Sequence, residues 1–153
     1  MEIREIATAG EKQHIARLVL EALPDWFGIP EAREEYIEKS ASQPFFAAFD
    51  GERAIGFLCL AETGKDTAEL YVMGVLQEYH RRGVGKALFA AAKQRAKELD
   101  YSFLQVKTVQ MGKYPEYDAT NRFYLALGFR EFEVFPTLWD ERNPCQIYVM
   151  SLQ

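Results

Sequence analysis

The chain has 153 residues, of which 48% are hydrophobic and 27% charged, and its formal net charge at pH 7 is -5. This length allows one well-formed core and excludes two ordinary domains, so we predict a single domain over residues 1–153. Because nonspecific nucleic-acid binding depends on many Lys and Arg side chains, the acidic balance argues against it. No apolar run approaches the roughly 18 residues that cross a bilayer, and we expect a cytoplasmic protein without a membrane partner.

The first part of the chain predicts one strand and two helices. Alternating charged and apolar residues predict a strand over 1–6. Apolar residues at helical spacing predict a helix over 10–23, and Thr8 fits the first position of a capping box before it. Pro24 ends this helix, and a second, charged helix follows over 31–41.

The remainder predicts six strands and two helices. Asp50 and Gly51 form a tight turn between two apolar stretches, which is typical of a hairpin. The most regular amphipathic pattern predicts a helix over 84–99, and Gly128 fits the left-handed residue that ends another helix. The predicted strands cover 44–50, 54–62, 67–75, 101–109, 129–135 and 145–152, with the last helix over 119–127 and loops over 110–118 and 136–144.

These elements follow the order βααβββαβαββ. Antiparallel hairpins stand beside one long strand-helix-strand crossover, so the sheet contains both orientations. We therefore predict an α/β (α+β) fold with a mixed, mostly antiparallel seven-stranded sheet flanked by four helices. Cys59 and Cys145 each lie in an apolar stretch without paired or metal-type spacing, and we expect buried free thiols and no metal site.

The stretch VLQEYHRRGVGKALF, residues 75–89, gathers positive charge around two glycines in an acidic chain. It joins a predicted strand to a helix, and the first amides of a helix lack intrahelical partners. Gly83 and Gly85 have no side chain to keep a ligand away from the backbone. A solvated helix start with basic residues is the alternative. The loop is otherwise typical of a phosphate-binding site, with charge-assisted contacts from Arg81, Arg82 and Lys86.

Two other phosphate-binding motifs do not fit this loop. A Walker loop requires glycine where His80 stands and Ser or Thr where Ala87 stands. The dinucleotide fingerprint requires a third glycine at the position of Leu88, together with repeated parallel βαβ units. Nucleotide phosphotransfer is therefore disfavoured.

Two motifs support a resemblance to one enzyme family. VLQEYHRRGVGKALF is similar to the coenzyme A signature of the GNAT superfamily of N-acetyltransferases, which reads Gln or Arg, two residues, Gly, any residue, then Gly or Ala. His80 occupies the first position and departs from that pattern. NRFYLALGF is similar to the end of the family's second helix through Tyr124, Gly128 and Phe129. The predicted order of elements resembles the family over the whole chain.

The resemblance implies acetyl-CoA as cosubstrate and no metal. The loop amides would hold the pyrophosphate, and Val75 would pair with the pantetheine arm as an added strand does. A backbone amide of Gly74 or Val75 would meet the oxyanion at a bulge in this strand. Asn121 is a further contact, although many members place an asparagine where this chain has Tyr117. The implied cofactor-binding residues are Gly74, Val75, His80, Arg81, Arg82, Gly83, Val84, Gly85, Lys86 and Asn121.

Glu69 is the candidate catalytic base. It is the only ionisable carboxylate in the apolar stretch AELYVMGV, and partial desolvation there would raise its pKa and make it a better base. It stands fourteen residues before Gly83, the spacing that the resemblance implies for a catalytic glutamate. Direct proton transfer and relay through water both remain open. So does a structural glutamate paired with a neighbouring Lys or Arg.

Tyr124 is the candidate catalytic acid. It matches the tyrosine that protonates the departing thiolate in many members of the family. A phenol with a pKa near 10 stays protonated at neutral pH and can donate to a sulfur anion. The alternative is a tyrosine that only packs in the core.

The resemblance implies an N-acetyltransferase that moves acetyl from acetyl-CoA to a primary amine by direct attack. The acceptor would be a small molecule or a peptide, because aromatic side chains and carboxylates in the segments that form the acceptor side suit an amine cation. A noncatalytic acyl-CoA-binding regulatory module is the alternative, and it needs neither Glu69 nor Tyr124. The chain resembles uncharacterised bacterial members, which leaves the identity of the acceptor open. A homodimer is possible.

Overall fold

The computed structural model describes residues 1–153 and contains one seven-stranded sheet. The strand order is β1-β2-β3-β4-β5-β7-β6, and every neighbouring pair is antiparallel except β4 with β5. This confirms the predicted mixed, mostly antiparallel sheet. The strands are β1 (Glu2–Glu5), β2 (Phe45–Asp50), β3 (Arg53–Gly64), β4 (Thr67–Val75), β5 (Phe103–Val109), β6 (Arg130–Asp140) and β7 (Asn143–Ser151).

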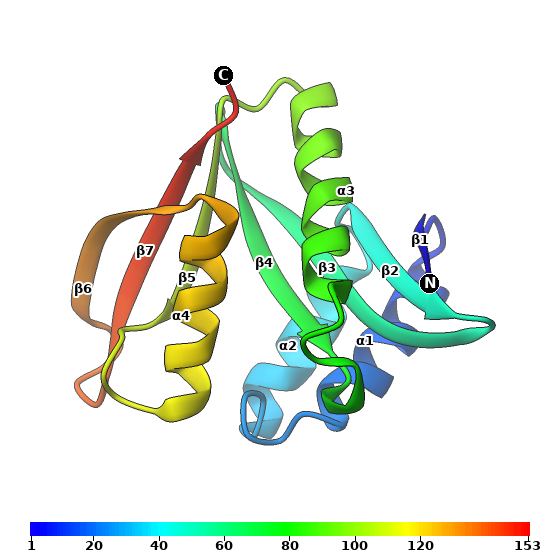
Figure 1. The fold of residues 1–153 in the computed structure, drawn as a ribbon, viewed down its shortest axis with the longest axis horizontal. Helices are drawn as coiled ribbons and strands as arrows, with labels where there is room; N and C mark the ends of the chain where they lie inside the picture. The colour runs from blue at the N-terminus through cyan, green and yellow to red at the C-terminus, as the bar shows by residue number, and fades with distance from the viewer.

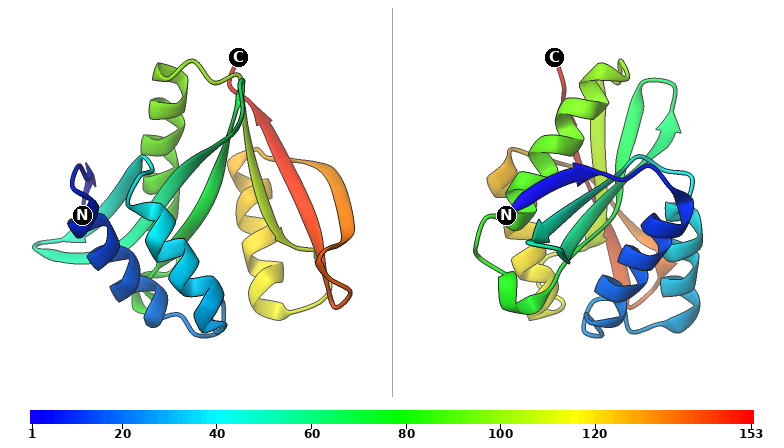
Figure 2. Two further views of the ribbon diagram at one scale, coloured as in Figure 1. Left: turned by 180° about the vertical axis from the view of Figure 1, so that it is seen from behind. Right: turned by 90° about the vertical axis from the view of Figure 1, so that its right-hand side faces the viewer.

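Four α-helices cover the two faces of the sheet (Figures 1 and 2). α1 and α2 lie against one face, and α3 and α4 lie on the opposite face, as the right-hand view of Figure 2 shows. Strands covered on both faces read as continuous apolar runs, which explains the sequences of β2 and β3. The helices are α1 (Ala9–Glu21), α2 (Pro30–Ser40), α3 (Val84–Glu98) and α4 (Pro115–Leu127).

One cluster of buried side chains holds these layers together. Phe45 of β2 and Phe57 of β3 stack within it, with ring centroids 5.0 Å apart, and Leu20 of α1 is fully buried. Burial of a side chain of this size stabilises the fold by about 2 kcal/mol. Cys59 and Cys145 are buried free thiols, as predicted.

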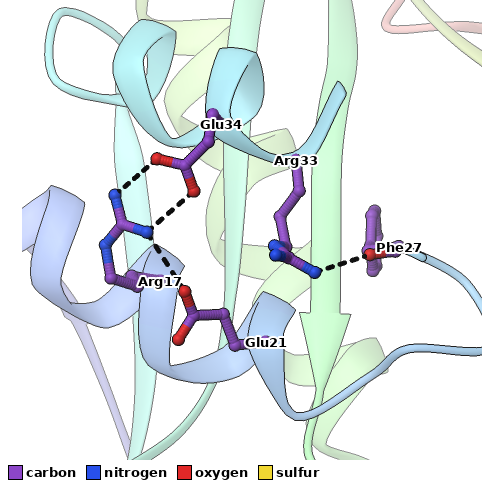
Figure 3. A network of polar contacts seen from close by, with 5 residues as sticks. All are labelled: Arg17, Glu21, Phe27, Arg33 and Glu34. Atoms are coloured by element: carbon purple, nitrogen blue, oxygen red, sulfur yellow. Dashed lines mark hydrogen bonds and ion pairs between the residues drawn. The ribbon is translucent and has the colours of Figure 1, made fainter. Parts of the chain in front are cut away.

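An ion-pair network fixes α1 against α2 on the surface (Figure 3). The guanidinium of Arg17 donates to both carboxylate oxygens of Glu34, at 2.7 and 2.8 Å, and to Glu21 at 3.1 Å. These groups are about half exposed, so solvent screens their attraction and their effect on stability is small. By joining α1 to α2, these contacts set the orientation of the two helices on either side of the loop 22–29.

The ends of the elements match some predictions and correct others. Thr8 accepts a hydrogen bond from the amide three residues later at 3.3 Å, and Gly128 ends α4 with a φ of 106°, as predicted. Two predicted loops are wrong. α4 begins with Pro115 in its first turn, where a residue without an amide proton is favoured. β6 and β7 cover most of 136–144 and meet in a turn whose amides donate to the Asp140 carboxylate.

Candidate functional site

The site lies where β4 and β5 separate. These strands pair only over Thr67–Glu69 and Phe103–Gln105, and residues 70–75 of β4 have no partner on that side. Figure 1 shows the two strands close together at one end and spread apart at the other. A cleft of about 1030 Å³ occupies this region, lined by the α1–α2 loop, α2, β4, residues 79–86, β5, α4 and the β6–β7 turn.

The open side of β4 presents a backbone amide to the cleft at Val75. Leu76 donates its amide to the carbonyl of Ile55 at 2.9 Å. Hydrogen-bonding direction alternates along an antiparallel pair, so Val75 directs its own amide and carbonyl away from β3. His80 Nε2 lies 2.7 Å from the Val75 carbonyl oxygen, which leaves the Val75 amide as the free group.

Gly74, in contrast to Val75, has a packing role. The bulge in β4 lies at Tyr71, and the carbonyl of Gly74 points to β3, 3.0 Å from where a Cβ on Gly56 would stand. The predicted bulge at Gly74 is therefore wrong, and of the two predicted oxyanion donors, Gly74 and Val75, only Val75 directs its amide away from β3. Glycine is required here because a Cβ would lie 2.9 Å from Val19 and 3.1 Å from Leu23 of α1.

The glycine loop leaves the start of α3 uncapped. Gly83 is the N-cap residue with a φ of 80°, and no side chain caps the first turn. The amides of that turn therefore lack protein acceptors and favour an anion. At Gly85 a Cβ would lie 2.8 Å from Met73 Cε and 3.0 Å from Phe123 Cζ, so these two side chains would have to shift to admit one. Basic residues surround it, with Arg81 and Arg82 exposed before the helix and Lys86 exposed within its first turn.

Glu69 lies buried at the point where the strands part. Its Oε1 accepts a hydrogen bond from Lys107 Nζ of β5 at 3.1 Å. Burial raises the pKa of the Glu69 carboxyl, and the Lys107 ammonium opposes that rise. The carboxylate is thus both desolvated and paired with a lysine, and its role as the base stays a prediction.

Lys107 was not among the predicted site residues. It lines the cleft, and 27% of its side chain is exposed. The signal in the sequence was a charged residue in the middle of the apolar strand that follows α3, the same anomaly that marked Glu69. Only the parallel register, which sets Glu69 opposite Gln105, brings the two charges together.

Tyr124 lines the same cleft from α4 and is 8% exposed. Burial raises its pKa, and the charge of Glu69 raises it further, so the phenol is protonated at neutral pH. Its ring packs edge-to-face on Phe129 with centroids 5.8 Å apart. The side chain is therefore held in the core while it borders the cleft.

Comparison with known proteins assigns this arrangement to a family. The sequence model of the Acetyltransferase (GNAT) family matches residues 12–129. The chain belongs to the GNAT family. No curated protein sequence matches the chain.

Solved structures share the fold over the whole GNAT chain at low sequence identity. A GNAT-family protein from Desulfovibrio desulfuricans is 19% identical, with a TM-score of 0.83 and 99% of each chain covered. An aminoglycoside 6'-N-acetyltransferase complexed with coenzyme A is 16% identical, with a TM-score of 0.76 and coverage of 100% of this chain and 98% of that chain. The ribosomal-protein-S18-alanine N-acetyltransferase from Escherichia coli is 17% identical, with a TM-score of 0.76 and coverage of 99% and 94%. None of the helices of this GNAT chain combines the length and apolar character that a membrane crossing requires.

His80 ties the glycine loop of this GNAT chain to its surroundings. Besides the contact with the Val75 carbonyl, its ring meets Trp26 edge-on, with centroids 5.7 Å apart. The imidazole lines the cleft, but one ring nitrogen is already used. Its first role is thus to join the end of β4 to the α1–α2 loop.

The structure corrects the prediction that Asn121 contacts the cofactor. Its side chain is fully buried, and its Nδ2 donates to the carbonyls of Val109 and Tyr117 at 2.8 and 2.7 Å. Its Oδ1 accepts from the Tyr148 hydroxyl at 2.5 Å. No polar group of Asn121 remains for a ligand, so in this GNAT chain it joins α4 to β5 and β7.

Asn121→Ala should lower the free energy of unfolding by about 2–4 kcal/mol, because the Tyr148 hydroxyl and the Val109 carbonyl lose a buried partner. Denaturant unfolding measures this loss. Coenzyme A affinity of the folded variant, measured by calorimetry below its melting temperature, should stay within about twofold of wild type. A loss of affinity with unchanged stability would restore the cofactor contact.

The opposite wall of the cleft is aromatic. Trp26, Phe27 and Tyr36 come from the α1–α2 loop and α2. The Tyr117 hydroxyl of α4 donates to the Trp26 carbonyl at 3.0 Å. Arg33 donates to the Phe27 carbonyl at 3.3 Å, as Figure 3 shows. These bonds fix the loop across the cleft of the GNAT chain, so that the aromatic wall, Lys107 and Tyr124 border the same space.

Proposed function

We propose that residues 1–153 form an acetyl-CoA-dependent N-acetyltransferase domain that moves the acetyl group to a primary amine. One observation carries this proposal. The same cleft borders the uncapped start of α3, the Val75 amide, Tyr124, and Lys107, which pairs with the buried Glu69. A phosphate-binding turn and acid-base groups on one cleft suit transfer from a phosphate-bearing carrier to a nucleophile.

The residues present fit coenzyme A. The first amides of α3, including those of Gly85 and Lys86, would hold the pyrophosphate, and glycine at 83 and 85 lets it approach. Arg81 and Arg82 would add charge-assisted hydrogen bonds. The Val75 amide would pair with the pantetheine arm or polarise the acetyl oxygen. Structural neighbours complexed with coenzyme A or acetyl-CoA support the choice of cosubstrate.

Two side chains of this protein would remove and donate the protons of the transfer. Bound acetyl-CoA supplies an activated thioester. A protonated amine cannot attack it, and an alkylamine has a pKa of about 10, so a base must remove a proton. Glu69 would do so directly or through water, since its raised pKa makes it a stronger base than an exposed carboxylate. Tyr124 would protonate the departing thiolate, because its own pKa keeps it protonated.

The acceptor is proposed as a small-molecule or peptide amine. The aromatic wall of Trp26, Phe27 and Tyr36 suits an ammonium group, and Glu116 adds a carboxylate to the cleft lining. The neighbours include enzymes named for an aminoglycoside and for a ribosomal protein, so the fold accommodates acceptors of very different size.

Two measurements test this function. A thermal shift should show stabilisation by acetyl-CoA and none by ATP with magnesium, since a ligand that binds only the folded state raises its stability. A panel of primary amines should then release free thiol from acetyl-CoA. Stabilisation without thiol release from any amine would favour the noncatalytic acyl-CoA-binding module, and stabilisation by ATP alone would overturn both.

Tyr124→Phe should lower kcat by about 10- to 100-fold and leave acetyl-CoA affinity nearly unchanged, because only the proton donor is removed. Steady-state kinetics with the best amine of the panel measures both constants. Tyr101→Phe is the matched control, since its hydroxyl donates to Glu62 at 2.6 Å outside the cleft. An unchanged kcat in the Tyr124 variant would remove this residue from the acid role.

Lys107→Met should move the acidic limb of the kcat/KM profile to higher pH. The Lys107 ammonium opposes the rise in the Glu69 pKa, so its removal raises that pKa further, and the base must be ionised to act. Lys107→Arg keeps the charge and should leave the limb near its wild-type position. A limb that does not move in the Met variant would show that another group titrates.

A further inference from the structure

We propose that Lys107 is a self-acetylation site, where the chain transfers an acetyl group from acetyl-CoA to its own Nζ when no acceptor occupies the cleft. This inference rests on the proposed function and extends it to a modification of the protein. The proposed acceptor is a primary amine, and the Lys107 side chain already places a primary amine beside the proposed base, Glu69.

The position of Lys107 differs from that of the other lysines. Its Nζ lies 3.1 Å from Glu69 Oε1, and the carboxylate side chain is only 10% exposed. The other lysine–glutamate pair, Lys39 with Glu35, is on the surface, with both side chains more than half exposed. Lys86 lines the cleft at the start of α3, where the proposed anion site lies. Lys107 is thus the lysine that combines access to the cleft with a desolvated carboxylate.

The reactive geometry follows from the sheet. Glu69 is opposite Gln105 in the short parallel segment, and Lys107 comes two residues later on β5, just past the point where the strands part. The Val75 amide and the start of α3 lie at the far end of β4. A carrier whose phosphates rest at that end would extend along the free edge of β4 toward Glu69, and so toward Nζ.

The step balances without a further reactant. The Lys107 ammonium gives one proton to the Glu69 carboxylate, and the neutral Nζ attacks the thioester carbonyl carbon. The C–N bond forms and the C–S bond breaks. Nζ releases its second proton to solvent as the amide forms, and the thiolate takes one proton from the Tyr124 hydroxyl. Solvent then returns a proton to Tyr124, and Glu69 releases its proton to solvent. The products are acetylated Lys107, free coenzyme A thiol and one proton.

Acetylation would change the site in a defined way. The amide carries no charge, so the ion pair with Glu69 is lost and the ammonium no longer opposes the rise in the Glu69 pKa. The acetyl group would also occupy space in the cleft where an acceptor amine must stand. The modified chain should therefore need higher pH for turnover and bind acceptors more weakly.

The test uses the whole 153-residue chain and acetyl-CoA with a carbon-13 acetyl group, which separates new from pre-existing acetylation. Without acceptor, mass spectrometry should find Lys107 labelled at least about 10-fold faster than the exposed Lys97 of α3, which reports uncatalysed acetylation. The Lys107 rate should not change when the protein is diluted, because the step is intramolecular. Glu69→Gln should slow labelling of Lys107 and leave Lys97 unchanged, and Lys107→Arg should remove the fast phase from the intact mass.

Separate outcomes overturn the inference and the proposed function. Thiol release with an amine, but labelling of Lys107 no faster than Lys97, would overturn the inference alone. A Lys107 rate that scales with protein concentration, or that is unchanged in the folded Glu69→Gln variant, would also overturn it. If acetyl-CoA neither stabilises the chain nor labels any lysine above background, the proposed function fails as well.

Discussion

Gly83→Asp should weaken acetyl-CoA binding by at least about 100-fold, which corresponds to about 2.7 kcal/mol. The N-cap of α3 would then hold a carboxylate where a diphosphate is expected, and the two negative charges would repel each other. The fold should persist, because no heavy atom lies within 4 Å of the added Cβ. Calorimetric titration with acetyl-CoA measures the loss.

Gly51→Asp is the matched control for this variant. Gly51 also has a positive φ, 62° against 80° for Gly83, and open space around its Cβ, but it lies in the β2–β3 turn. The Gly51→Asp substitution therefore adds the same negative charge, but away from the cleft. It also costs a similar backbone strain of about 1 kcal/mol. It should match the stability of Gly83→Asp and keep wild-type affinity. Equal affinities in the two variants would place the coenzyme elsewhere.

Glu69→Gln should lower kcat/KM by about 100-fold and remove the acidic limb of its pH profile. A base acts only when ionised, so the rate should rise as pH passes the Glu69 pKa, which burial raises above its ordinary value. In the Gln variant only the rise from the acceptor amine should remain, near its own pKa of about 10. The profile of thiol release over pH measures both effects.

The control for that variant is Glu52→Gln, which removes one exposed carboxylate from the β2–β3 turn. It should leave the rate and the profile unchanged. A Glu69→Gln enzyme that keeps its acidic limb would show that the proton leaves by another route, or that the acceptor binds as the neutral amine.

The order of elements could be predicted from the sequence because it depends on local patterns. Alternation and helical spacing locate the strands and helices, and single residues such as Thr8 and Gly128 locate their ends. The last hairpin was harder, because β6 is an edge strand that is largely exposed and lacks a clear buried face. The glycine loop was predictable for the same local reason, since Gly83, the turn and the start of α3 are adjacent in the chain.

The pairing of side chains could not be predicted, because it depends on residues far apart in the sequence. Asn121 is held by Val109 and Tyr148, 12 and 27 residues away. Glu69 meets Lys107 at a separation of 38 residues, and only through the parallel register of β4 and β5. Tertiary structure decides in each case whether a polar residue serves a ligand or the fold.

The unpaired stretch of β4 has an evolutionary consequence. A peptide N–H is common to nineteen of the twenty amino acids, so a recognition surface made from main chain survives nearly every point mutation, with proline as the exception. At Val75 and at the first turn of α3 the groups proposed to meet the ligand are main-chain amides, so substitutions that keep the backbone path should preserve them. Such tolerance is compatible with a fold shared at 16–19% identity.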